Sequence, residues 1–89
     1  MSIDLSDEKK ELFETLHKIE TAEDLELFMN DLCTYKEIDS MAQRLKAAKL
    51  LMENKTYAQI IEQTDISSAT LSRVSRCVKH GEGYKKFLK

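Results

Sequence analysis

The chain of 89 residues contains no proline and no tryptophan, and only two glycines, both near its end. Proline and glycine interrupt helices, so their scarcity leaves long helical segments unbroken. No apolar run approaches the roughly 20 residues that would span a bilayer. The first residues also lack the basic and apolar regions of a secretory signal. The sequence therefore predicts an all-α protein that does not enter the membrane.

Cysteine is scarce as well, with only Cys33 and Cys77. Two cysteines cannot build a disulfide framework, and without a secretory signal they indicate the reducing cytoplasm. No two of these cysteines and the histidines His17 and His80 have the spacing of paired zinc ligands, so we expect no metal site. No nucleophile, base and orienting acid can be assembled from the spacing either. We therefore expect neither a cofactor nor an enzyme.

Charge is divided unequally along the chain. Residues 1–40 carry a net charge of −8, whereas residues 41–89 carry +6 and all three arginines. A basic half suggests an anionic partner, most often nucleic acid, although two solvated helix faces would give the same pattern. The pI near 5.7 argues against indiscriminate coating of nucleic acid.

Helix signals divide the first half into three segments. Ser6 can cap a first helix, a capping-box pattern at Thr21 opens a second, and a capping box at Thr34 opens a longer third that ends at Asn54. The apolar face of the third helix is unusually broad, comprising Ile38, Met41, Ala42, Leu45, Ala47, Ala48, Leu50, Leu51 and Met52. A small chain can hardly cover this face alone, so we expect a second subunit to bury it.

Two short helices follow with the spacing of a helix-turn-helix motif. A capping box at Thr56 opens a helix over about 57–63, residues 64–66 form a tight turn, and Ser67 starts a helix over 68–79. The positions that hold such helices together are Ile60, Thr64, Ile66, Leu71 and Val74. Asp65 stands at the turn position usually held by glycine, and Ile61 stands where a small residue is usual. Aspartate tolerates the left-handed conformation better than most residues, so the turn remains feasible.

The end of the chain contains two further signals. The segment 80–83 ends the second motif helix, with Gly81 or Gly83 as candidates for a left-handed cap. A last half-turn over 84–88 either docks through its aromatic residues or frays. With these elements the chain is expected to contain about six helices.

The second motif helix presents small, hydroxylated and basic residues outward, which suits the major groove of DNA. The candidate DNA-binding residues are Thr56, Tyr57, Ser67, Ser68, Ala69, Thr70, Ser72, Arg73, Arg76 and Lys79. Among them, Ser68, Ala69, Thr70 and Ser72 are expected to face bases. Thr56, Arg73, Arg76 and Lys79 are expected to contact phosphates or guanine edges. Tyr57 either stacks on or bonds to the DNA, or covers the edge of the motif.

The segment Ala69-Thr70-Leu71-Ser72-Arg73, together with the order of helices before it, resembles the Trp repressor superfamily. The likeness is strongest to its small YerC/YecD-type branch and extends over about residues 32–88. It implies an intertwined all-helical homodimer. The two helix-turn-helix motifs of such a dimer would enter successive major grooves of a palindromic operator.

The corepressor site of that family is matched only in part. Arg44 and Arg73 match the two arginines that sandwich the indole ring of tryptophan. The glycine that gives the ring space is replaced by Val74, and a ligand-contacting serine is replaced by Cys77, whose thiol is a weaker hydrogen-bond partner. We therefore predict that tryptophan is not the effector. Whether Arg44 and Arg73 bind another small molecule is left open.

We interpret residues 1–89 as a single domain, with dimerisation helices in 1–53, the DNA-binding motif in 56–79 and a short terminal helix in 84–88. The predicted function is that of a cytoplasmic, dimeric, sequence-specific transcriptional regulator, most simply a repressor. One alternative is a protein-interaction module whose acidic half binds a basic partner and whose motif does not bind DNA. Another is a small all-α enzyme of the chorismate mutase kind, with Arg44 and Arg73 holding a dianionic substrate.

Overall fold

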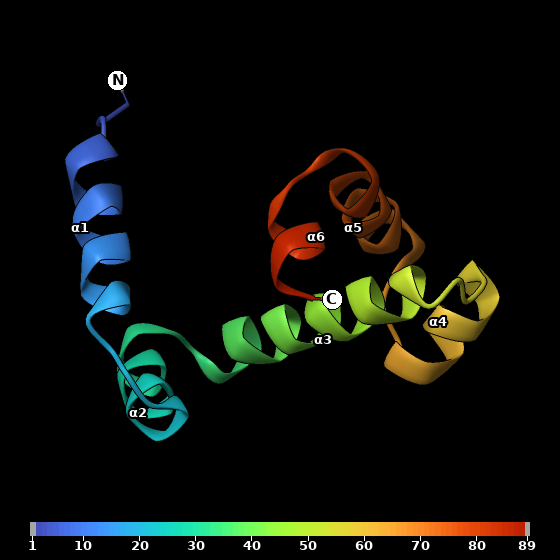
Figure 1. The fold of residues 1–89 in the computed structure, drawn as a ribbon, viewed down its shortest axis with the longest axis horizontal. Coiled ribbons are helices and arrows are strands. Elements are labelled where there is room, and N and C mark those ends of the chain that lie inside the picture. The colour runs from blue at the N-terminus through green and yellow to red at the C-terminus, as the bar shows by residue number, and fades with distance from the viewer. Residues whose placement is uncertain (1, 89) are drawn as a thin grey trace. The chain divides into compact units, whose positions relative to one another are not determined.

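The computed structural model describes residues 2–88, which form six α-helices and no strand (Figure 1). The helices are α1 (Ser6–His17), α2 (Ala22–Leu32), α3 (Tyr35–Met52), α4 (Tyr57–Thr64), α5 (Ser68–His80) and α6 (Gly83–Phe87). The predicted all-α class is confirmed. None of the helices in this range is long and apolar enough to cross a membrane. The chain divides into two compact units near residue 35, which are described separately below.

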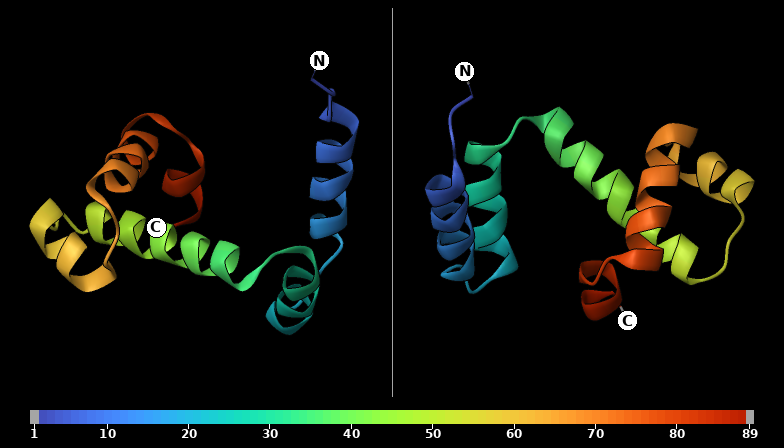
Figure 2. Two further views of the ribbon diagram at one scale, coloured as in Figure 1. Left: turned by 180° about the vertical axis from the view of Figure 1, so that it is seen from behind. Right: turned by 90° about the horizontal axis from the view of Figure 1, so that it is seen from above.

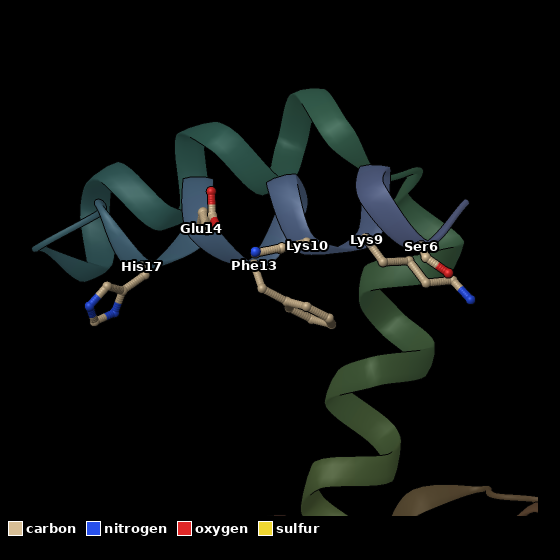
Figure 3. A pocket seen from close by; sticks show the side chains of 6 residues that line it. All are labelled: Ser6, Lys9, Lys10, Phe13, Glu14 and His17. Atoms are coloured by element: carbon tan, nitrogen blue, oxygen red, sulfur yellow. The ribbon is translucent and has the colours of Figure 1, made fainter. Parts of the chain in front are cut away.

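In the first unit, α1 and α2 contain no buried residue. Leu12 and Leu16 of α1 and Phe28 and Met29 of α2 are half-buried. Phe13 is 66 % exposed and projects from α1 beside an open hollow (Figure 3). An apolar side chain gains hydrophobic free energy only where it leaves water, so this unit buries little of its apolar surface by itself.

The start of α1 differs from the prediction. Ser6 is the first residue inside the helix and not its cap, because the cap position is Leu5, which makes no side-chain cap bond. The backbone N–H and the hydroxyl of Ser6 both donate to Oδ1 of Asp4, and these bonds hold the pKa of the Asp4 carboxyl below its ordinary value. The predicted start of α2 is confirmed, since Oγ1 of Thr21 accepts from the N–H of Asp24 at 3.1 Å.

In the second unit, α4, α5 and α6 gather around the C-terminal half of α3 (Figures 1 and 2). The buried core consists of Ala47, Ala48, Leu50, Ile60, Ile66, Leu71 and Val74. Tyr84 and Leu88 pack against it, so the end of the chain docks. On the apolar face of α3, Ala47, Ala48 and Leu50 are buried. Leu45, two residues before Ala47, is 41 % exposed.

The junction between α5 and α6 corrects the prediction of a left-handed glycine cap. Gly81 is extended, with φ −84° and ψ 174°, and neither glycine has a positive φ. Gly81 is instead required by close approach, because a Cβ atom at this position would lie 2.7 Å from the backbone oxygen of Cys77. Nζ of Lys85 donates to the backbone oxygen of Lys79 at 2.7 Å. The positive charge of Lys85 is also stabilised by the negative end of the α5 dipole.

The substitution Gly81→Ala is expected to lower the free energy of unfolding by about 1–3 kcal/mol, because the added methyl group would overlap the last turn of α5. The matched control is Gly83→Ala, where a Cβ atom meets nothing within 4 Å. Urea unfolding followed by circular dichroism measures both. Equal stabilities of the two variants would contradict the close-approach argument.

Candidate nucleic-acid interface

The first helix of the motif starts at the predicted capping box. Oγ1 of Thr56 accepts from the N–H of Gln59 at 3.2 Å, and the N–H of Thr56 donates to Oε1 of Gln59 at 2.9 Å. These bonds satisfy two backbone donors that a helix start otherwise leaves without partners. The helix ends at Thr64, one residue later than predicted.

The turn between α4 and α5 has the predicted left-handed residue. Asp65 has φ 59° and ψ 23°, and its N–H donates to the oxygen of Ile61 at 2.8 Å. Ile66 follows and is only 2 % exposed, so the turn is anchored in the core by this side chain. A left-handed residue changes the direction of the chain within one position. The axis of α5 therefore runs in a different direction from that of α4.

The second motif helix starts at Ser67, as predicted. Oγ of Ser67 accepts from the N–H of Thr70 at 3.1 Å and donates to Oγ1 of Thr70 at 2.9 Å. Both hydroxyl groups therefore hold the start of the helix. The proton of the Thr70 hydroxyl is not used in this pair, so it can still donate to a phosphate or a base acceptor.

Most candidate DNA-binding residues lie together on the exposed side of α5. Leu71, Val74 and Ser75 are buried on its inner side. The outer side consists of two adjacent rows at helical spacing, which are Ala69, Arg73 and Arg76 in one row and Ser68, Ser72 and Lys79 in the other. All six are exposed, and residues 66–81 include no acidic residue. We call these six residues the α5 outer face. Its side chains are small near the start of the helix and positively charged towards its end.

The remaining candidates lie at the edges of this surface. Thr70 is half-buried on the flank of α5, and Ser67 caps the helix. Thr56 is exposed but its hydroxyl serves the capping box, and Tyr57 is 41 % exposed at the first position of α4. The structure thus places these four residues at helix starts or on a flank, where backbone N–H groups also point outward.

One further residue borders the α5 outer face and was not predicted from the sequence. His80 is exposed and lies four positions after Arg76 and seven after Arg73, in the row that begins with Ala69. The spacing was visible in the sequence, but residue 80 was considered there only as part of the segment 80–83 that ends the helix. It extends the row of nitrogen donors on this face by one helical turn.

The residues matched to the corepressor site lie in different surroundings. Arg44 is half-buried on α3, whereas Arg73 is exposed on α5. Val74 is 2 % exposed within the core, and Cys77 is exposed. An open hollow in this unit is lined by other residues, namely Lys46, Lys49, Met52, Glu53 and Leu88. Among residues 2–88, no group of three or more histidine, cysteine or acidic side chains is placed to hold a metal ion.

Known proteins share this combination of an all-helical fold and a helix-turn-helix motif. The model of the Trp repressor protein family matches residues 7–89, and the chain belongs to this family. The uncharacterized protein YerC of Bacillus subtilis (strain 168) is 43 % identical over 74 residues, which cover 83 % of this chain and 71 % of YerC.

Two solved structures share the fold. A TrpR-like protein from Eubacterium eligens ATCC 27750 is 37 % identical with a TM-score of 0.86, covering 92 % of this chain and 87 % of the other. A Trp repressor-like protein from Staphylococcus aureus is 34 % identical with a TM-score of 0.84, covering 98 % and 91 %. The predicted likeness to the YerC-type branch is confirmed.

The left-handed turn yields a prediction about Asp65. The substitution Asp65→Val is expected to lower the free energy of unfolding by about 1 kcal/mol or more, because a β-branched side chain is strained at positive φ. Asp65→Gly removes the strain and is expected to keep or raise stability. Thermal unfolding of the two variants tests the order, and a valine variant as stable as the glycine variant would contradict it.

Proposed function

We propose that this protein is a sequence-specific DNA-binding transcriptional regulator that acts as a homodimer, most simply as a repressor. The observation that carries the proposal is the α5 outer face, which is exposed, free of acidic residues and held on a capped helix-turn-helix motif. Membership of the Trp repressor family supports the same function. A regulator of this kind acts where bacterial DNA lies, in the cytoplasm.

The α5 outer face suggests a division of roles. Ser68, Ala69 and Ser72 lie near the start of α5, which is the part of a recognition helix that contacts base edges. Their small size lets the helix approach the bases closely. Arg73 and Arg76 follow within two turns, where guanidinium groups bind phosphates or the O6 and N7 acceptors of guanine. Lys79 adds a charge at the far end.

The apolar surfaces that the chain leaves exposed support the homodimer. Phe13, Leu27 and Leu45 are 66 %, 67 % and 41 % exposed, and α1 and α2 bury no residue. A second copy of this chain would cover such apolar surfaces at no cost in new sequence, as in most symmetric oligomers. Two motifs in one dimer would then read two half-sites of a palindrome.

We further propose that tryptophan is not the effector. Val74 is 2 % exposed and belongs to the core, where its branched side chain occupies the position at which the family has a glycine beside the ring. Cys77 offers a thiol in place of a serine hydroxyl, and a thiol is a poor donor. Another small molecule that binds between Arg44 and Arg73 would need a different shape.

The decisive experiment is selection of a binding site from a random duplex library, followed by salt titration with and without tryptophan. We expect a palindrome with half-sites about one helical turn apart. The affinity is expected to fall steeply with salt and to be unchanged by tryptophan. Failure to enrich any site at low salt would contradict the proposal and favour the protein-interaction module.

A double variant, Arg73→Ala with Arg76→Ala, links the binding to the α5 outer face. Its affinity for the selected duplex is expected to fall at least about tenfold, and the salt slope by about 0.9 for each lost phosphate contact. The control is Lys9→Ala with Lys10→Ala, which removes the same charge from α1, outside the motif. Equal losses in both variants would show general attraction and not recognition by α5.

The dimer is tested by the double variant Phe13→Ser with Leu27→Ser. Both side chains are exposed in the single chain, so a monomer would lose little stability by the change. A dimer that buries them is expected to dissociate towards the monomer mass in light scattering at micromolar concentration. The control is Glu11→Ser with Glu26→Ser, on the same helices. A wild-type protein of about 10.3 kDa in solution would contradict the homodimer.

A further inference from the structure

One side chain of α3 contacts the turn that directs α5. Nε2 of Gln43 donates to the backbone oxygen of Thr64 at 2.9 Å, in partly buried surroundings, and joins positions 21 residues apart. A carbonyl oxygen can only accept, so the amide nitrogen of Gln43 must be the atom that faces it. Gln43 lies one and two turns before the buried Ala47 and Leu50, so it belongs to the core-facing side of α3.

Thr64 is a junction of hydrogen bonds as well as the last residue of α4. Its Oγ1 donates to the oxygen of Ile60 at 2.7 Å and accepts from the N–H of Ile66 at 3.3 Å. The second of these bonds spans the left-handed Asp65. The bond from Gln43 ties this local network to α3 and therefore to the rest of the unit.

We propose that Gln43 is a positioning residue that holds the turn so that α5 presents its outer face at the angle required to read base sequence. This inference rests on the proposed function. The course of α5 is set by the backbone at 64–67, which the structure restrains through the side chain of Ile66 in the core and through the Gln43 bond to Thr64.

The two restraints differ in what they control. The buried Ile66 side chain holds the turn in place, but an apolar contact is non-directional. The hydrogen bond depends on direction and weakens steeply when it is bent, so it fixes the orientation of the peptide between Thr64 and Asp65. Contacts to base edges tolerate errors of about 0.5 Å and 10–20° at most. Contacts to phosphates through long basic side chains are more tolerant, so Gln43 acts on specificity more than on charge attraction.

The test uses Gln43→Met, which keeps the length of the side chain and removes the donor. Affinity for the duplex selected with the wild-type protein is expected to fall about tenfold, as the loss of a partly buried hydrogen bond implies. Affinity for a scrambled duplex of the same length and the salt slope are expected to stay within about twofold, because no basic residue is changed.

The control for a merely structural effect is Leu51→Val, which loosens the packing against the core on the same helix and keeps the Gln43 donor. Compared under conditions where it is as stable as Gln43→Met, this variant is expected to keep the wild-type ratio of specific to non-specific affinity. Gln43→Glu offers a rescue, since a carboxylate cannot donate to the Thr64 oxygen but a protonated carboxyl group can. Its specific affinity relative to wild type is expected to recover as the pH is lowered to about 4, below the ordinary glutamate pKa of about 4.3.

Hydrogen exchange without DNA separates this inference from the proposed function. In Gln43→Met, the amides of Asp65 and Ile66 are expected to exchange faster, while that of Leu71 in the core is unchanged. If the wild-type protein binds no duplex, the proposed function fails whatever the exchange shows. If the wild-type protein binds its site and Gln43→Met keeps both the affinity ratio and slow exchange at the turn, the inference on Gln43 is overturned.

Discussion

The second unit depends on the close packing of three segments around two alanines of α3. Ala47 and Ala48 are completely buried, and their small side chains let the backbone of α3 lie near the helices that cover it. Ile60 from α4, Ile66 from the turn and Leu71 from α5 complete this core. Since α4 and the turn each contribute one buried apolar side chain and α5 contributes two, the position of α5 is set by few contacts. A single hydrogen bond such as that of Gln43 can then affect the orientation of α5.

Several helix ends in this unit are fixed by polar side chains, although α5 ends at Gly81. Thr56 and Ser67 cap the starts of α4 and α5, Asp65 supplies the left-handed residue, and Lys85 donates to the end of α5. Polar side chains do the work of helix-breaking residues here, which explains how a chain without proline folds into short helices. As a result, the hydroxyl groups of Thr56 and Ser67 are engaged in capping the helices.

Many helix starts of the chain could be predicted because their signals are local. Thr21, Thr56 and Ser67 each start a helix within three residues of the atoms they bond, so spacing alone identifies them. Ser6 was misplaced because it lies one residue inside the helix, where its hydroxyl bonds to Asp4. The need for Gly81 was predicted for the wrong reason, since glycine is required there by the close approach to the backbone oxygen of Cys77 and not by a positive φ. The bond between Gln43 and Thr64 joins distant positions, and no local pattern indicates it.

The separation of the two sides of α5 has an evolutionary consequence. Its inner side, with Leu71 and Val74, carries the packing, whereas Ala69 and Ser72 on the outer side are exposed and contribute little to the core. Substitutions at exposed positions usually change stability by less than about 0.5 kcal/mol. The outer side can therefore drift to new residues while the scaffold stays the same. Related chains with one fold can in this way diverge in what they recognise without passing through unfolded intermediates.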